Sequence, residues 1–226
     1  MKVFIIGITG GTGSRIAERL LRDGHAVGGL VRSRAQADAL VQKGMVTVVG
    51  DIATIAEADL TAAMRGSDVV VFSAGAGGGG DEATRAVDGK GPGKAASAAQ
   101  RAGISRIYLV SVFPEAWREK RLGHDFDYYI REKKNAEVDL VGREIDWVIL
   151  RPSALLDDPG TGRVSLGFAE IHEEITRDDV AATIVALIAE PRIRRVVLEV
   201  TGGAMPVRTA VARLVGTPPQ LPALAD

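Results

Sequence analysis

The opening stretch, residues 2–22, constrains the fold most, because an apolar run passes through a glycine-rich loop into residues at helical spacing. The run Val-Phe-Ile-Ile is typical of a buried strand, since branched and aromatic side chains suit a pleated surface covered on both sides. Behind the loop, Ile16, Leu20 and Leu21 recur at the spacing of one helix face. The glycines between the two patterns are Gly7, Gly10, Gly11 and Gly13. The sequence therefore predicts a strand–loop–helix unit.

This loop has the chemistry of a phosphate site. A helix N-terminus offers unpaired N–H groups and a partial positive charge, and both favour an anion. Glycine lets the backbone approach a pyrophosphate, which a side chain would prevent. An ordinary glycine-rich turn is the alternative. Because the glycines close an N-terminal strand and open a helix, the pattern favours a dinucleotide site.

A second apolar run, residues 25–31, ends in Arg32, Ser33 and Arg34. In a dinucleotide fold the residue about 20 positions past the glycines meets the adenosine ribose, and an acid there selects a free 2′-hydroxyl. Here two guanidinium groups flank a hydroxyl, and arginine can bind a phosphate through two parallel hydrogen bonds. The alternative is a solvated charged run in which Ser33 caps the next helix. The triplet favours NADP(H) over NAD(H).

Two more strand ends carry candidate ligand contacts. After the third strand, residues 45–49, Asp51 could meet the amino group of an adenine while Ile52 packs on the ring; alternatively, Asp51 begins the helix expected over 55–64. After the fourth strand, residues 68–72, come the small residues Ser73, Ala74 and Gly75. Small residues at the carboxyl end of a strand allow close approach of a ligand, which is where open α/β sheets bind.

The catalytic candidates follow the fifth strand, residues 106–110. Ser111 could hydrogen-bond a substrate carbonyl or hydroxyl beside the nicotinamide, or satisfy the loop that follows. Tyr129 and Lys133 share one face of a helix expected over 126–141. A lysine ammonium and the oxidised nicotinamide would together lower the tyrosine pKa from its usual value near 10, and the lysine could bond the nicotinamide ribose. Such pairs are common on amphipathic helices, so only the position after the fifth strand of a dinucleotide fold favours catalysis.

Composition excludes several classes of function. Because 28 basic residues nearly balance 29 acidic ones, no global charge favours nucleic acid or an anionic membrane. The absence of cysteine excludes disulfides, thiolate metal sites and cysteine nucleophiles, and the three histidines lack ligand spacing. The chain starts directly with a strand, and no apolar run approaches the roughly 18 residues of a membrane helix. We expect a cytoplasmic protein, monomeric or homodimeric, that binds a small-molecule substrate and no metal.

Taken together, these stretches resemble the atypical short-chain dehydrogenase/reductases. Within that family, the branch that this sequence resembles binds NAD(P)H and lies close to nitrogen-regulator-like and flavin/biliverdin-reductase-like proteins. Members of this branch are often labelled NAD-dependent epimerase/dehydratase. The resemblance covers about residues 1–210. Its most specific pieces are Gly-Ile-Thr-Gly-Gly-Thr-Gly at 7–13, Gly-His at 24–25, Leu-Val-Arg at 30–32, Gly-Asp-Ile at 50–52, Val-Phe-Ser-Ala-Gly at 71–75, Val-Asp at 87–88, Leu-Arg-Pro-Ser at 150–153 and Thr-Arg-Asp-Asp-Val at 176–180.

The resemblance implies roles for individual residues. In the family, the glycine loop with Thr9 and Thr12 binds the pyrophosphate, and the arginine that matches Arg32 binds the 2′-phosphate. The acidic and aliphatic residues that match Asp51 and Ile52 hold the adenine. The small residues that match Ala74 and Gly75 line the ribose. The cofactor-binding residues expected are Gly7, Thr9, Gly10, Gly11, Thr12, Gly13, Arg32, Ser33, Arg34, Asp51, Ile52, Ser73, Ala74, Gly75, Lys133, Pro152 and Ser153. The catalytic residues expected are Ser111, Tyr129 and Lys133, in the serine and Tyr-x-x-x-Lys positions of the family.

The expected fold is one doubly wound, Rossmann-like α/β domain over residues 1–217, with three α/β/α layers. Its largely parallel seven-strand sheet has the order 3-2-1-4-5-6-7, and a small C-terminal substrate lobe covers about 151–217. A short outlying strand is expected within 161–169, a helix restart or kink at Gly-Pro-Gly 91–93, a mobile glycine loop at 77–80 and a poorly ordered tail at 218–226. The polar loop 114–127, which contains Trp117, is expected to form a substrate lid or wall.

The function expected from these features is an NADP(H)-dependent oxidoreductase acting on a small carbonyl, quinone or similarly reducible compound. A redox sensor that binds NADP(H) and reports to a protein partner is an alternative, motivated by the glycine loop at 77–80. A nucleotide-sugar epimerase or dehydratase is another, although the short region after residue 151 argues against it.

Overall fold

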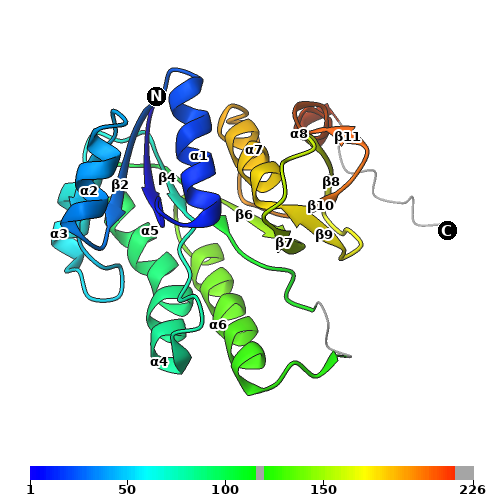
Figure 1. Ribbon diagram of the computed structural model, residues 1–226, viewed down its shortest axis with the longest axis horizontal. Coiled ribbons are helices and arrows are strands. Elements are labelled where there is room, and N and C mark those ends of the chain that lie inside the picture. Colours follow the sequence, from blue (N-terminus) through cyan, green and yellow to red (C-terminus); the bar gives the residue numbers. More distant parts are fainter. Residues whose placement is uncertain (116–119, 217–226) are drawn as a thin grey trace.

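The computed structural model describes residues 1–115 and 120–216, and it has a central sheet with helices on both faces (Figure 1). In the described residues this sheet has nine strands. In spatial order they are β3 (Val46–Val49), β2 (Ala26–Val31), β1 (Lys2–Ile6), β4 (Val69–Phe72), β5 (Arg106–Val110), β6 (Asp146–Pro152), β10 (Val196–Gly202), β8 (Arg163–Gly167) and β11 (Met205–Pro206). Seven neighbouring strands, from β3 at one edge to β10, pair in parallel. The expected Rossmann-like order is confirmed, with β10 as its seventh strand.

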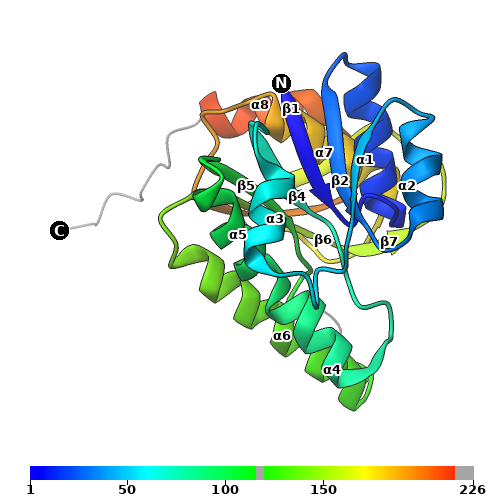
Figure 2. The same ribbon diagram turned by 90° about the vertical axis from the view of Figure 1, so that its left-hand side faces the viewer.

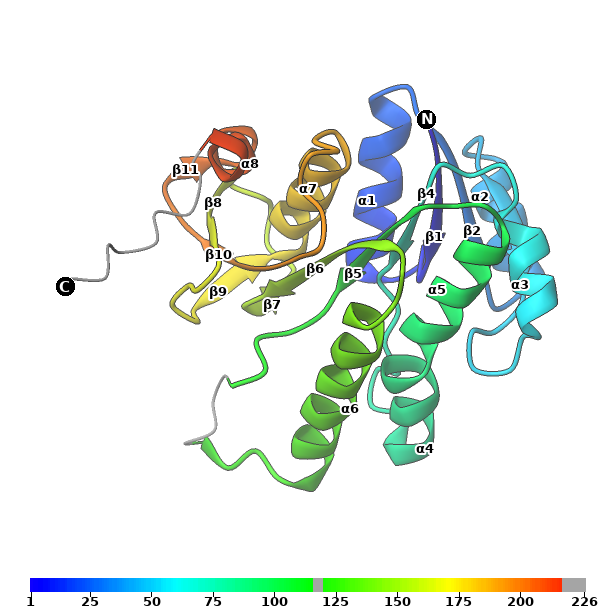
Figure 3. The same ribbon diagram turned by 180° about the vertical axis from the view of Figure 1, so that it is seen from behind.

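Helices cover the two faces of this sheet (Figure 3). The helices are α1 (Gly11–Arg22), α2 (Arg34–Val41), α3 (Glu57–Met64), α4 (Gly80–Thr84), the π-helix η1 (Arg85–Gly89), α5 (Gly91–Arg101), α6 (His124–Val141), α7 (Arg177–Ile188) and α8 (Val207–Gly216). Buried side chains of α1, α2, α7 and α8 form one hydrophobic cluster, and those of α3, α5 and α6 form a second. The two clusters lie on opposite faces of the sheet, so the molecule has the expected three layers.

The central strand β1 shows why its sequence is continuously apolar. Side chains along a strand alternate between the two faces of the sheet. Val3 and Ile5 belong to the first cluster, whereas Phe4 and Ile6 belong to the second, and all four are buried. A strand covered on both faces needs apolar residues at every position.

The turn from β1 into α1 depends on glycine for close packing. Gly7 has a positive φ of 88°, and a Cβ there would lie 2.6 Å from the backbone nitrogen of Ala74. A Cβ on Gly13 would overlap the carbonyl oxygen of Gly7. Gly13 therefore lets α1 pack against the end of β1, and Gly7 lets the chain that follows β4 pack against the same turn.

The helical stretch after β4 is irregular in the way the sequence indicates. Gly77, Gly78 and Gly80 have positive φ values, a conformation that suits glycine. The short α4 continues into the π-helix η1, and α5 then begins at Gly91 with Pro92 in its first turn. The expected restart at Gly-Pro-Gly is confirmed, because proline is tolerated in the first turn of a helix.

The segment after residue 151 mostly extends the main sheet. The outlying strand expected within 161–169 is β8, which pairs antiparallel with β10 and β11. Within the described residues, β7 (Ala154–Leu156) and β9 (Glu174–Thr176) form a separate, two-stranded sheet. Residues 116–119, with Trp117, and the tail expected at 218–226 lie outside the described residues.

The carboxyl ends of β1, β4 and β5 meet at one edge of the sheet. Figure 2 shows α4 and α6 extending together beyond this edge. Among the described residues, no helix is both long enough and apolar enough to cross a membrane.

The packing at Gly13 predicts a stability effect. Gly13→Ala should lower the free energy of unfolding by about 1–3 kcal/mol, because the new methyl group meets backbone that cannot move aside cheaply. Gly142→Ala is the matched control, since its Cβ would make only ordinary contacts at 3.6 and 3.7 Å and its φ is −72°. Urea denaturation measures both variants. Equal stabilities for the two would contradict the packing role of Gly13.

Candidate functional site

Two adjoining cavities form one cleft at the carboxyl edge of the sheet. The first cavity, of about 260 Å³, lies at the ends of β1, β2 and β3, and the second, of about 690 Å³, lies toward β5 and α6. Both are lined by the same short stretch of residues, Gly10, Ser73, Ala74, Gly75 and Ala76. The combined cleft suits an elongated ligand that crosses the glycine loop, at the position where doubly wound sheets bind nucleotides.

The first cavity has apolar walls and two charged residues. Leu30 and Ile52 contribute buried apolar surface, while Arg32 and Asp51 contribute charge. A carboxylate oxygen of Asp51 accepts the N–H of Ala53 at 2.8 Å, and α3 begins only at Glu57. The hypothesis that Asp51 begins this helix is therefore wrong, because a turn separates them. Asp51 and Ile52 both line the cavity.

The three residues of the Arg-Ser-Arg triplet have different contacts in the structure. The hydroxyl of Ser33 accepts the N–H of Gln36 and caps α2. Arg34 forms an exposed ion pair with Asp38 at 3.2 Å. Of the triplet, Arg32 alone lines the first cavity. The capping alternative therefore holds for Ser33, and the case for phosphate recognition rests on Arg32.

The glycine loop lies between the two cavities. Gly7, Thr9 and Gly10 line the first, and Gly10, Gly11 and Thr12 line the second. No side chain caps α1, and its first turn has no acidic residue. The N–H groups of this turn and the helix dipole therefore fit a diphosphate.

Arg177 is a cleft residue that sequence reasoning missed. It begins α7 and lines the second cavity, where its side chain would lie 2.8 Å from a Cβ on Gly11. Its guanidinium pairs with the exposed carboxylate of Asp157 at 2.9 Å. The Thr-Arg-Asp-Asp-Val motif marked this residue, but only the packing of α7 beside α1 brings it to the loop.

The second cavity brings the three expected catalytic residues together. Ser111 at the end of β5 and Tyr129 and Lys133 on α6 all line it. The Lys133 ammonium is 5.9 Å from the ring centre of Tyr129, and the lysine side chain is buried, at 4 % exposure. Leu122, Asp125 and Phe126, from the segment expected to form a lid or wall, also line this cavity.

Asp88 is the buried partner of Lys133 and was not among the expected site residues. It lies on η1 at 1 % exposure and lines the second cavity. One of its oxygens accepts the N–H of Ala76 at 2.9 Å, and the other lies 3.6 Å from the Lys133 ammonium. The lysine also donates to the carbonyl of Val110 at 3.2 Å. These contacts hold the ammonium at the floor of the cleft.

A second buried network lies behind Ser111. Its hydroxyl is 2.5 Å from a carboxylate oxygen of Glu137, and Glu137 is held by Arg151 through hydrogen bonds of 3.2, 3.2 and 2.5 Å. Arg151 also pairs with Glu199 at 3.6 Å. Burial by itself would lower the pKa of Arg151, but the hydrogen bonds and charge of Glu137, together with Glu199, raise it above its ordinary value.

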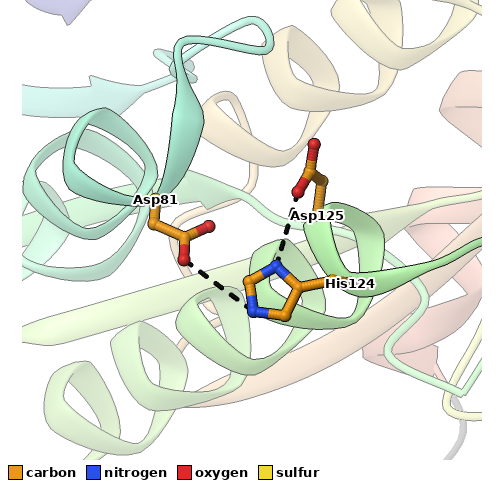
Figure 4. Close-up of side chains that lie close together, drawn as sticks. All are labelled: Asp81, His124 and Asp125. Carbon is orange, nitrogen blue, oxygen red and sulfur yellow. Dashed lines mark hydrogen bonds and ion pairs between the residues drawn. The ribbon is translucent and has the colours of Figure 1, made fainter.

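At the mouth of the second cavity, Asp81 and Asp125 face the imidazole of His124 (Figure 4). Its ring nitrogens lie 3.9 Å from an Asp81 oxygen and 3.4 Å from an Asp125 oxygen. The cluster joins α4 to α6, a proximity that the separation in sequence concealed. All three residues are exposed, so water can satisfy each of them, and the grouping does not by itself define a metal centre.

Five of the expected cofactor contacts line neither cavity, namely Ser33, Arg34, Gly13, Pro152 and Ser153. Gly13 is buried where α1 packs on the strands. Pro152 is buried in β6, and the hydroxyl of Ser153 accepts the N–H of Glu173 at 3.2 Å.

Comparison with known proteins identifies what this chain is similar to. The model of a family described as NAD(P)H-binding matches residues 7–191. The uncharacterised sugar epimerase YhfK of Bacillus subtilis is 34% identical over 217 residues, which cover 95% of this chain and 100% of YhfK.

Two solved structures have the same fold. The oxidoreductase YlbE of Lactococcus lactis is 25% identical with a TM-score of 0.84, over 96% of this chain and 98% of YlbE. The anaerobillin reductase ChuY of Escherichia coli O157:H7 is 27% identical with a TM-score of 0.77, over 91% of this chain and 98% of ChuY.

The ion pair behind Ser111, in which Glu137 is buried and Arg151 is half-buried, predicts a large stability effect. Arg151→Met should lower the free energy of unfolding by about 3 kcal/mol, because it leaves the buried carboxylate of Glu137 without its counter-charge. Arg143→Met is the matched control on the same region of the molecule. Arg143 pairs with the exposed Asp139, so that its loss should cost no more than about 1 kcal/mol. Chemical denaturation of both variants tests the difference, and similar losses would show that burial of Glu137 is unimportant.

Proposed function

Since the chain belongs to the NAD(P)H-binding family, we propose that it is an NADP(H)-dependent oxidoreductase that reduces a small carbonyl compound, quinone or similar acceptor. The observation that carries the proposal is the cavity shared by Ser111, Tyr129 and Lys133, which continues into the glycine loop. The names of two similar proteins, an oxidoreductase and a reductase, support the reaction class.

The residues of the cleft fit the parts of a dinucleotide. The uncapped N-terminus of α1 would hold the diphosphate, with Arg177 beside it. Asp51 and Ile52 would hold the adenine in the first cavity, and Arg32 would bind a phosphate on the ribose. This arrangement directs the other end of the dinucleotide toward Tyr129.

The proposed chemistry is hydride transfer coupled to proton transfer. A bound reduced nicotinamide would supply the hydride for this reaction. Tyr129 donates its phenolic proton to the carbonyl oxygen, so that an alcohol forms, and solvent returns a proton to the phenolate. The Lys133 ammonium stabilises the negative charge on Tyr129 during this step.

Lys133 can act on both the tyrosine and the cofactor. An ammonium group has three N–H donors, and Val110 and Asp88 face two of them. The third is available for a ribose hydroxyl. Asp88 is a positioning residue in this scheme, because it contacts the lysine and holds it in the cavity.

An epimerase that uses the cofactor without net redox change is the second candidate, because a relative with 34% identity is named as a sugar epimerase. The same cleft would serve this reaction. Retention of tightly bound cofactor after purification, without net NADPH consumption when substrate is added, would favour it over the reductase.

The proposal predicts that purified protein oxidises NADPH with members of a panel of quinones and aldehydes. Tyr129→Phe should lower turnover by about 10²–10⁴-fold, the usual contribution of a general acid, while NADPH affinity stays within about twofold of wild type. Absorbance at the reduced nicotinamide band measures turnover, and calorimetry measures affinity.

Tyr128→Phe is the matched control for that variant. Tyr128 is next in sequence but stacks on His124 and lies under Arg131, and it does not line the cavity. Its loss should leave turnover unchanged. Full activity in Tyr129→Phe would remove the proposed role of the tyrosine.

Cofactor preference can be tested at Arg32. Arg32→Ala should weaken NADPH binding by about 10–100-fold through the loss of hydrogen bonds to a charged phosphate, and NADH binding by less than about threefold. Arg34→Ala is the control, since Arg34 pairs with Asp38 and does not line the cavity. Titration calorimetry gives the four affinities. An equal loss for NADPH and NADH would argue against phosphate selection by Arg32.

A further inference from the structure

The hydroxyl of Ser111 is already committed to a buried partner. Its oxygen lies 2.5 Å from a carboxylate oxygen of Glu137. Ser111 lines the second cavity, whereas Glu137 does not, and the two residues are 6 % and 5 % exposed. The hydrogen bond therefore runs from the cavity wall back into the protein.

The direction of this hydrogen bond follows from Arg151. Its guanidinium donates to both carboxylate oxygens of Glu137, and an arginine has donors but no acceptor. A positive charge in contact with a carboxylate favours the charged form, which only accepts hydrogen bonds. Glu199 contacts the other side of the guanidinium at 3.6 Å and holds it in place. Ser111 must therefore donate its proton to Glu137.

A serine hydroxyl has one proton and two lone pairs. With the proton donated to Glu137, the atom that Ser111 presents to the cavity is a hydrogen-bond acceptor. A carbonyl oxygen placed against it would face a lone pair and would gain no hydrogen bond. A hydroxyl or N–H group would be bound there.

We propose that Glu137 and Arg151 fix Ser111 as an acceptor, so that the cleft selects substrates with a hydroxyl or N–H group beside the reducible group. This inference rests on the proposed function, and it names the substrate class for that same site. Hydroxycarbonyl compounds, lactams and N-heterocycles with an N–H have the required donor. The reducible oxygen is then left to Tyr129 alone.

A single substitution in this network should reverse the hydrogen-bonding role of Ser111. In Glu137→Gln the side-chain carbonyl would turn toward the donors of Arg151, because an amide nitrogen cannot accept from them. The amide NH₂ would then face Ser111 and donate to its oxygen. The serine proton is released by this exchange and can point into the cavity. One substitution of nearly equal size therefore converts the Ser111 position from acceptor to donor.

The experiment uses protein saturated with NADP⁺, which cannot deliver a hydride, and two probes of nearly the same shape. Oxindole is a lactam with an N–H donor, and 2-coumaranone is the lactone with a ring oxygen in its place. Calorimetry should give about tenfold tighter binding of oxindole to wild type, the effect of one hydrogen bond and an unsatisfied partner. Equal affinities, a preference for the lactone, or no binding of oxindole would overturn the proposal.

Two variants complete the test. Ser111→Ala should remove the preference, since neither probe then meets a polar group at that position. Glu137→Gln should reverse it in favour of the lactone, an outcome that a merely structural role of Glu137 would not produce. If Glu137→Gln fails to fold in thermal denaturation, Ser111→Ala decides alone, and an undiminished preference in it rejects the proposal.

The probe-binding experiment can fail or succeed independently of the proposed reductase activity. Probe binding is measured without turnover, whereas the reductase is tested by NADPH oxidation. A preference for oxindole in protein that never oxidises NADPH would reject the reductase and keep the acceptor role of Ser111. NADPH oxidation by protein that shows no preference for oxindole would support the reductase and reject the acceptor role of Ser111.

Discussion

Close packing of α1 against β1 is the contact on which the rest of the structure depends. A Cβ on Gly13 would meet the backbone of Gly7, so the helix can approach the end of β1 only because this position lacks a side chain, and the missing Cβ of Gly7 likewise lets the backbone at Ala74 approach. The approach leaves the first turn of α1 uncapped at the carboxyl edge of the sheet. The same edge collects the ends of β4 and β5, because all these strands run parallel. One packing requirement thereby leaves, at the edge where the strands end, a helix N-terminus whose free N–H groups suit an anion.

Charged groups are buried at this edge, where they are expensive to desolvate. Asp88 and Lys133 pair on one side of the second cavity, and Glu137 pairs with Arg151 behind Ser111. Such pairs contribute little net stability, because the cost of removing two charges from water offsets most of their attraction. Their effect is geometric. They fix an ammonium group and a hydroxyl in the cavity wall, and fixed polar groups are what binding and catalysis require.

Particular residues show how far the sequence could predict the site. The triplet at 32–34 could be assigned as a whole to a phosphate, yet the structure gives Ser33 to a helix cap and Arg34 to a surface ion pair. The residue type shows which contacts a side chain can make, whereas the contact that it does make depends on the direction in which the backbone points the side chain. The role of Asp51 is ambiguous in the sequence for the same reason, and the structure resolves it by placing a turn between Asp51 and α3. Glu137 carried no local signal, because its partners follow it by 14 residues or precede it by 26.

The sequence by itself determined the positions of the parallel strands along the chain, the glycine turn and the placement of Tyr129 and Lys133 on one helix face, because each follows from a local pattern: a run of apolar residues, the absence of a Cβ, or helical periodicity. Tertiary structure alone decided which buried charges meet. Asp88 reaches Lys133 and Glu137 reaches Arg151 across different elements, and nothing short of the packed sheet fixes those distances. Such pairs form because a charge removed from water requires a partner, wherever along the chain that partner lies.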